Sequence, residues 1–245
     1  MNILLTNDDG FNSAGILALK EVLKEYGEVY TFAPKSPQSG CGASLHTSFP
    51  VNVHKVDDYN YIIDGSPVDC VQIASVILKH KKIDLIVSGL NWGYNLSNDT
   101  MYSGTCSACF QALIFRTKSI AFSTNKFNTP LSITKYGKEI MDYILSNDLL
   151  SKKYYLNVNL PDIEKYPTYK GIKITELYIR KTHYTKEYYN KKTNMIQIHY
   201  IHNDINNDDT YDVSAVENGY ISITPMSLIN YKRSDYKKVL KKVNK

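Results

Sequence analysis

The chain has 245 residues, of which 43% are hydrophobic and 22% charged, and its formal net charge at pH 7 is +5. This composition is that of a globular protein with a substantial core, and it excludes a disordered or collagen-like chain. No apolar run is long enough to span a membrane, and no basic leader precedes an apolar stretch, so we expect no membrane association and a cytoplasmic location.

The positive charge is concentrated in two segments, 178–193 and the tail "YKRSDYKKVLKKVNK". Such a distribution favours a solvated or subunit-contacting surface over nucleic-acid binding, which we do not expect. The four cysteines are too few for a disulfide framework and are expected to be reduced. Cys106 and Cys109 form a C-x-x-C, but the nearest histidine pair, His199 and His202, lies far downstream. We therefore favour apolar packing over a zinc site.

The first 125 residues alternate between apolar strands and amphipathic helices. The predicted strands cover 2–6, 28–34, 82–89 and 119–124, with antiparallel extended segments around 49–63, and the predicted helices cover 14–26, 66–80 and 105–117. This alternation predicts an α/β fold with a mainly parallel sheet and helices on both faces. Because right-handed crossovers bring the carboxyl ends of such strands to one edge, a ligand is expected to bind there.

The pattern changes beyond about residue 130. A helix over 133–147 is predicted to precede strands over 154–161, 171–177 and 195–201. The stretch 178–202 is typical of a projecting hairpin, which is seldom stable alone and is expected to pack on another subunit. We interpret 1–245 as a single domain, with a core over about 1–130 and a tail over about 227–245.

The stretch "LLTNDDGFNSAG", residues 4–15, ends an apolar strand in two adjacent carboxylates, Asp8 and Asp9. One interpretation is a simple turn, since Asp and Gly suit turns and Ser13 can cap a helix. The other is a cation site, because later strands deliver further oxygen donors, Ser39, Asn91 and Asn95, to the same edge. Carboxylate, hydroxyl and amide oxygens suit Mg²⁺ or Mn²⁺ rather than zinc.

A second feature is expected at this edge. Ser103, Gly104 and Thr105 begin a helix, where free N–H groups and the helix dipole favour a phosphate. Taken alone, this segment more often caps a helix. Beside a cation site it indicates a phosphoryl substrate.

Several motifs, in order along the chain, resemble the SurE survival-protein family. They are "ILLTNDDGFNSAGI", "AP.SPQSG", "DGSPVDCV", "VSGLNWGYNL", "YSGTCSA" and "DTYDVSAVENGYISITPM". The resemblance implies a Rossmann-like three-layer domain and one divalent metal ion held by Asp8, Asp9, Ser39 and Asn91. It also implies that Asn95, Ser103, Gly104 and Thr105 surround the phosphate. The chain departs from the family in having Gln111 and Ala112 where Glu-Gly is usual.

The family hydrolyses nucleoside 5'- and 3'-monophosphates, and some members also shorten polyphosphate. The resemblance thus implies a metal-dependent 5'-nucleotidase that forms a homodimer or homotetramer through its C-terminal hairpin and helical tail. Asp8 and Asp9 are the candidate catalytic residues. The alternative is a non-catalytic nucleotide-binding module. A nicotinamide-dependent dehydrogenase is disfavoured, because Asn-Asp-Asp-Gly stands where the glycine-rich fingerprint belongs.

Four further residues have two interpretations each. Asp64 and Asp69 fit either a turn and a helix start or a role in the site. For His46 we favour an ordinary hydrogen-bonded histidine over a substrate contact. Trp92, the single tryptophan, fits either packing against its loop or stacking on a base.

Overall fold

The computed structural model describes residues 1–125, 129–180, 182–190, 192–202 and 208–227. In this part of the chain, one nine-stranded sheet has the order β3-β4-β2-β1-β5-β6-β7-β11-β8, and β9 and β10 form a separate two-stranded sheet. The strands are β1 (Asn2–Thr6), β2 (Glu28–Pro34), β3 (Val53–Lys55), β4 (Asn60–Ile63), β5 (Leu85–Trp92), β6 (Lys118–Thr124), β7 (Tyr155–Leu160), β8 (Ile172–Ile174), β9 (Thr182–Asn190), β10 (Met195–His202) and β11 (Ile221–Met226). The helices are α1 (Ala14–Leu23), α2 (Pro67–Ile77), the 3₁₀ helix η1 (Ser97–Met101), α3 (Gly104–Ile114), α4 (Thr129–Ser146) and α5 (Asp212–Glu217).

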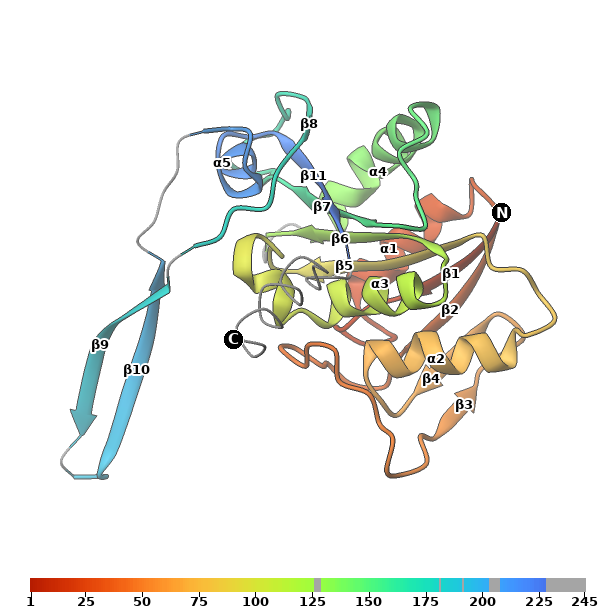
Figure 1. Cartoon of the computed structure of the whole chain (residues 1–245), viewed down its shortest axis with the longest axis horizontal. Coiled ribbons are helices and arrows are strands. Elements are labelled where there is room, and N and C mark those ends of the chain that lie inside the picture. Colours follow the sequence, from red (N-terminus) through yellow and green to blue (C-terminus); the bar gives the residue numbers. More distant parts are fainter. Residues whose placement is uncertain (126–128, 181, 191, 203–207, 228–245) are drawn as a thin grey trace, which may run out of the picture.

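Helices cover both faces of the main sheet, which confirms the predicted α/β fold. α1 packs against α4 on one face, and α2 packs against α3 on the other (Figure 1). The position of β1 between the two helical layers explains why its sequence is continuously apolar. Ile3 and Leu5 belong to the core under α1 and α4, whereas Leu4 belongs to the core under α2 and α3. Side chains of a strand alternate between faces, so a strand buried on both faces needs apolar residues at every position.

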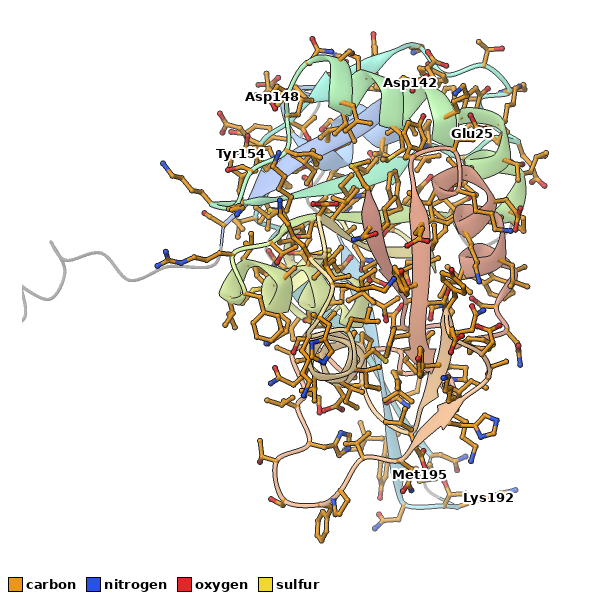
Figure 2. The ribbon with its side chains drawn as sticks, turned by 90° about the vertical axis from the view of Figure 1, so that its right-hand side faces the viewer. Glu25, Asp142, Asp148, Tyr154, Lys192 and Met195 are labelled. Carbon is orange, nitrogen blue, oxygen red and sulfur yellow. The ribbon has the colours of Figure 1, made fainter. Side chains whose placement is uncertain are left out.

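Exposed ion pairs also link α4 to the end of α1 at the protein surface. Lys138 on α4 lies 2.7 Å from Glu25, just beyond α1, and 3.8 Å from Asp142. Figure 2 shows Glu25 and Asp142 near each other at this end of the molecule. These exposed ion pairs contribute little stability compared with the apolar contacts beneath them.

The strand order of the sheet reverses between β1 and β5. β2 lies on one side of β1 and β5 on the other, and all three are parallel, with Leu4 opposite both Tyr30 and Ile86. The chain then continues outward through β6 and β7. In open α/β sheets, the crevice at such a reversal of strand order is where ligands bind.

The C-terminal half adds one strand, β11, that no local pattern predicted. β11 pairs antiparallel with β7 and parallel with β8, so the last described strand lies inside the sheet. α5 and β11 were not predicted, and the strand predicted over 171–177 is restricted to Ile172–Ile174. The hairpin predicted over 178–202 is confirmed as β9 and β10, which project from the sheet (Figure 1). Apart from residue 227, the predicted helical tail lies outside the described residues.

The predicted elements of the first half are confirmed with shifted ends. β5 runs through Asn91 to Trp92 rather than ending at Gly89, and α1 ends at Leu23. Searching the described residues for a helix long and apolar enough to cross a membrane finds none.

Candidate active site at the carboxyl ends of β1 and β5

The turn after β1 is held by Asn7. Its Nδ2 donates to the Gly10 carbonyl oxygen (3.0 Å) and to Ser13 Oγ (2.8 Å), and its Oδ1 accepts from the Gly10 N–H (3.2 Å). Gly10 has a backbone φ angle of +101°, which residues with a side chain rarely adopt. Because the chain turns here, Asp8 and Asp9 contact different elements, α3 and the end of β5.

Asp8 is held by two hydrogen bonds from Thr105 at the start of α3. Thr105 Oγ1 donates to Asp8 Oδ1 at 2.6 Å, and the Thr105 N–H donates to Asp8 Oδ2 at 3.2 Å. The Asp8 side chain is almost fully buried, with 4% exposure. Burial raises the pKa of this carboxyl, and the Thr105 bonds partly oppose that rise.

Gly104 allows α3 to approach Asp8. A Cβ atom at this position would lie 2.8 Å from Cys41 Sγ, 2.9 Å from Asp8 Cβ and 3.1 Å from Pro67 Cγ. These separations are below ordinary van der Waals contact, so no larger residue fits without displacement of Asp8 or its neighbours. The small residue in "SGT" therefore has a packing reason that is independent of any ligand.

Asp9 points to the other side of the crevice. Its Oδ2 accepts from the Trp92 N–H at 3.0 Å, which ties the turn after β1 to the end of β5. Burial, and next the negative charge of Asp8, raise the pKa of Asp9 to about 6. Asp9 is only partly buried, so of the two carboxylates it is the one that solvent reaches.

Asn91 and Ser39 each stand next in sequence to a residue that bonds to one of the two aspartates, Trp92 to Asp9 and Gln38 to Asp8. Asn91 Nδ2 donates to the Gly93 carbonyl oxygen at 2.7 Å, so its amide nitrogen is engaged and Oδ1 is the remaining oxygen donor. The Gln38 N–H donates to the Asp8 carbonyl oxygen at 2.7 Å. This bond brings the loop that carries the exposed Ser39 next to Asp8.

The donor set fits a hard divalent cation. Within the described part of the chain, no three His, Cys, Asp or Glu residues gather as a metal cluster, and no ion pair joins Asp8 or Asp9 to a basic side chain. Within the described residues, no basic side chain therefore compensates the two carboxylates. Burial raises the pKa of both, and the charge of Asp8 adds to the rise at Asp9. Asp8, Asp9, Asn91 and Ser39 offer only oxygen, which suits Mg²⁺ or Mn²⁺.

The residues predicted to bind phosphate have partners within the protein. Ser103 Oγ accepts from the Cys106 N–H at 3.1 Å and caps α3, while Thr105 is engaged by Asp8. Asn95 is buried, and its Nδ2 donates to Ser123 Oγ at 2.8 Å. Its backbone N–H donates to Asn159 Oδ1 at 3.0 Å. Their role toward a phosphate stays a prediction.

Two of the secondary candidates, Asp69 and His46, have local structural roles. Asp69 forms a capping box with Ser66 at the start of α2, and His46 Nδ1 lies 2.6 Å from Asp69 Oδ2. These contacts agree with the helix-start and hydrogen-bonded interpretations. Gln111 Nε2 donates to Gln72 Oε1 at 3.0 Å, a contact between α3 and α2 away from the carboxylates. Cys106 and Cys109 pack in an apolar cluster with Tyr155, as predicted.

Sequence reasoning missed two supporting roles. Thr105 was predicted as a phosphate contact, whereas here it anchors Asp8 across 97 positions of sequence. Asp212 was not singled out; it is fully buried, and its carboxylate accepts from the N–H groups of Ser97 (2.8 Å) and Tyr178 (3.0 Å). It thereby fixes the loop that follows Asn95. Its one sequence signal is its position at the start of a short helix within "DTYDVSAVENGY".

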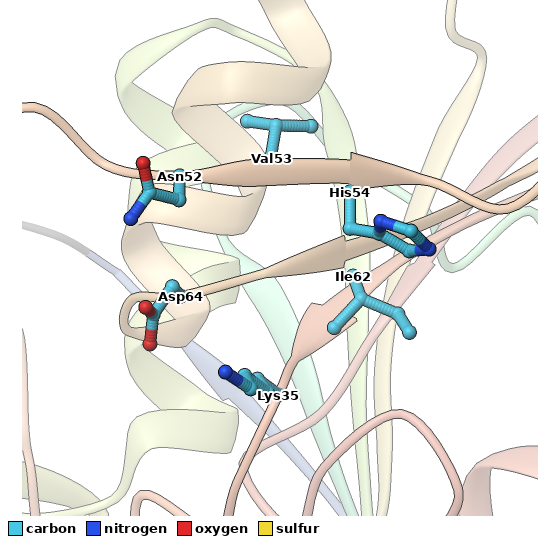
Figure 3. A pocket seen from close by; sticks show the side chains of 6 residues that line it. All are labelled: Lys35, Asn52, Val53, His54, Ile62 and Asp64. Carbon is cyan, nitrogen blue, oxygen red and sulfur yellow. The ribbon is translucent and has the colours of Figure 1, made fainter.

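Two hollows open near the ends of β1, β2 and β4. One, of about 420 Å³, is lined by Asp9, Trp92, Lys35 and the turn after β1. The other has the same volume and is lined by Lys35, Asn52, Val53, His54, Ile62 and Asp64. Figure 3 shows Lys35 and Asp64 near each other in this second hollow, beside the β3 and β4 pair. Lys35 lines both hollows, so the two adjoin.

Known proteins similar to this chain agree in sequence and in fold. The family model described as "Survival protein SurE" matches residues 3–184. A protein named 5'-nucleotidase SurE from Aquifex aeolicus is 39% identical over 94% of both chains, and one of the same name from Campylobacter concisus is 36% identical over 92% of both. The crystal structure of a SurE protein from Aquifex aeolicus superposes with a TM-score of 0.86 at 36% identity, covering 98% of each chain. The chain belongs to the SurE survival protein family.

Proposed function

We propose that this protein is a divalent-metal-dependent 5'-nucleotidase, which hydrolyses nucleoside 5'-monophosphates, and also 3'-monophosphates, to nucleoside and phosphate. The observation that carries the proposal is the pair of uncompensated carboxylates, Asp8 and Asp9, in the crevice where the strand order reverses. The names of the relatives from Aquifex aeolicus and Campylobacter concisus support the same activity.

The residues that would hold one Mg²⁺ or Mn²⁺ ion are Asp8, Asp9, Asn91 and Ser39. A divalent cation bound there supplies positive charge that stabilises the phosphoryl oxygens and promotes ionisation of a nearby water. The oxygens of the four side chains are the part of this site that the protein itself contributes. Hydrogen bonds with Thr105, Trp92 and Gly93 orient Asp8, Asp9 and Asn91, in that order.

The two carboxylates have separate tasks. Both oxygens of Asp8 accept hydrogen bonds from Thr105, so Asp8 is a fixed ligand that keeps its charge in one place. Asp9 receives one hydrogen bond, at Oδ2, and is reached by solvent. Asp9 is therefore the carboxylate that can orient a water molecule and accept its proton. Ser103, Gly104 and Thr105 at the start of α3, with Asn95, provide the neighbouring polar surface for the phosphoryl group.

The proposal includes a homodimer or homotetramer assembled through the β9 and β10 hairpin. Tyr188, Tyr189, Met195 and Ile196 on this hairpin are each more than half exposed. Figure 2 shows Lys192 and Met195 at the far end of the hairpin, remote from Asp148 and Tyr154. A two-stranded hairpin with exposed apolar side chains is marginal alone and gains stability by packing on a partner.

The test is phosphate release from a panel of nucleoside 5'- and 3'-monophosphates with Mg²⁺, with Mn²⁺ and with EDTA. Asp8→Asn keeps the shape of the side chain and removes its charge, so it is expected to abolish metal-dependent release while the protein stays folded by circular dichroism. The matched control is Asp58→Asn, in the exposed turn between β3 and β4, which is expected to release phosphate at the wild-type rate. No release from folded wild-type protein under any condition would overturn the proposal and favour a binding module.

A further inference from the structure

The hollow beside Asp9 has an apolar wall that the proposed chemistry at phosphorus does not use. Its lining combines Trp92, Phe11 and Pro37 with the polar side chains of Asp9, Asn12 and Lys35. Its volume of about 420 Å³ lies within the range of small-molecule sites, about 300–1,000 Å³. Asp9 belongs to both the carboxylate pair and this hollow, so a ligand whose phosphate lies at the carboxylates has its remainder beside this wall.

Trp92 has no structural role that accounts for its ring. Its backbone N–H is engaged by Asp9, but 49% of the residue is exposed to solvent, and it belongs to none of the apolar core clusters among the described residues. No ring contact joins it to another aromatic side chain in the described part of the chain. The interpretation of Trp92 as packing against its loop therefore accounts for only half of its surface.

Phe11 is anchored differently. Its N–H donates to the Pro34 carbonyl oxygen at 2.8 Å, and its ring packs partly against the core under α1 and α4. It thus forms a fixed part of the wall, while Trp92 presents an open face. An aromatic ring held on rigid backbone next to a catalytic carboxylate is suited to stack on a flat heterocycle.

We propose that Trp92 is the stacking platform for the nucleobase of the substrate, with Phe11 and Pro37 completing the apolar wall. This inference rests on the proposed nucleotidase function and names its specificity residue. Stacking area grows with the size of the base, so Trp92 favours purine over pyrimidine nucleoside monophosphates. It contributes nothing toward a sugar phosphate that lacks a base.

The first experiment compares kcat and KM for AMP, CMP and ribose 5-phosphate in wild type, Trp92→Ala and Trp92→Phe. We expect Trp92→Ala to lower kcat/KM for AMP about tenfold, chiefly by raising KM, with a smaller effect on CMP and less than a twofold effect on ribose 5-phosphate. Trp92→Phe keeps a stacking ring and is expected to recover most of the loss. Phe115→Ala, an exposed aromatic that lines a different hollow, is the matched control and is expected to match wild type.

An equal loss for all three substrates in Trp92→Ala would overturn the inference, because it would assign Trp92 to positioning Asp9. An unchanged kcat/KM for AMP would overturn it as well.

The second experiment uses the fact that Trp92 is the single tryptophan of the chain. Titration of the Asp8→Asn variant with AMP, where no turnover is expected and one of the two carboxylate charges is removed, is expected to quench its fluorescence, and ribose 5-phosphate at the same concentration is expected to leave it unchanged. Equal responses to both ligands would contradict stacking. If AMP quenches the emission but wild type hydrolyses no monophosphate with any metal, the proposed function fails and the stacking site stands.

Discussion

At the scale of single residues, the site depends on separating two neighbouring carboxylates. Unit charges about 4 Å apart repel by about 1 kcal/mol in water and several-fold more in a partly dry site. The turn at Gly10 directs Asp8 to Thr105 and Asp9 to Trp92, and each carboxylate receives donors from a different element. Burial, and next the negative charge of Asp8, raise the pKa of Asp9 to about 6, so the ionised pair is held at a free-energy cost that a bound cation would offset.

The raised pKa of Asp9 predicts a pH-dependent stability in metal-free protein. The folded-state pKa of Asp9 is raised, so the folded protein holds this proton more tightly than the unfolded chain. Ionising Asp9 therefore destabilises the fold as pH rises from about 4 to about 6, and the full penalty persists above that window. We expect Asp9→Asn to be more stable than wild type in EDTA at pH 7.5, by about 1–2 kcal/mol after allowance for solvent screening.

Thermal unfolding of both proteins in EDTA at pH 4.0 and 7.5 measures this effect. The stability difference should shrink toward zero at pH 4.0. Saturating Mn²⁺ at pH 7.5 should reverse the order, because wild type gains binding energy that Asp9→Asn loses. Equal stability of the two proteins in EDTA at pH 7.5 would contradict the cost of ionising a partly buried Asp9 beside Asp8.

A second prediction concerns the Thr105 hydroxyl. Thr105→Val preserves the shape of the side chain but removes the donor that lies 2.6 Å from Asp8 Oδ1. A hydrogen bond to a charged group contributes about 1.5–3 kcal/mol, so we expect kcat/KM for AMP to fall about tenfold to a hundredfold. Thr105→Ser, which keeps the hydroxyl, should retain most activity. Equal activity of Thr105→Val and Thr105→Ser in steady-state assays would show that the backbone N–H of Thr105 alone positions Asp8.

At the scale of elements, the sequence predicts the strands and helices whose signal is local. β1, β2, β5 and β6 are apolar runs, and α1 and α2 have helical periodicity and capping residues, Ser13 and Ser66. Because parallel strands deliver their carboxyl ends to one edge, chain order alone predicts that the ends of β1 and β5 adjoin, and the hydrogen bond between Asp9 and Trp92 joins those two ends. That much of the site is a property of the topology.

The rest depends on contacts between distant segments, which leave no local pattern. β11 enters the sheet between β7 and β8 although it is the last described strand. Asp212 holds Ser97 across 115 positions, and Thr105 holds Asp8 across 97. Each pairing becomes visible only when the fold is complete, since the sequence gives the residue types but not their partners.

The close approach of α3 to β1 is an element-scale feature with a direct test. In Gly104→Ala the new methyl group would lie 2.9 Å from Asp8 Cβ and 2.8 Å from Cys41 Sγ, so α3 or Asp8 must move. We expect the affinity for Mn²⁺, measured by calorimetry, to fall at least tenfold while the far-ultraviolet circular dichroism is retained. Gly137→Ala is the matched control, because its methyl group would also be crowded, at 3.1 Å from Ile133 Cδ1 and Val22 Cγ1, but between α4 and α1 rather than against Asp8. Unchanged Mn²⁺ affinity in Gly104→Ala would mean that the helix start does not constrain Asp8.

At the scale of the whole molecule, the hairpin is the part that the fold does not explain. The nine-stranded sheet has helices on both faces, whereas β9 and β10 pair only with each other in the described residues. Their register is regular from Asn190 opposite Met195 to Thr182 opposite His202, with one shift between His199 and Tyr200. Because this well-formed ribbon carries exposed Tyr188, Tyr189 and Ile196, we expect it to gain stability from a partner surface.

This argument predicts that association depends on the apolar surface of the hairpin. Ile196→Asp places a charge where 59% of the residue is exposed, so it cannot disturb a core, but it would meet the apolar face of a partner subunit. Light scattering after gel filtration should show wild type as a dimer or tetramer and Ile196→Asp shifted toward monomer, with a dissociation constant at least tenfold higher. Val76→Asp, at an equally exposed position on α2, should leave the oligomeric state unchanged. A wild-type chain that is monomeric at micromolar concentration would overturn the assignment, and the hairpin would then need a partner other than a copy of this chain.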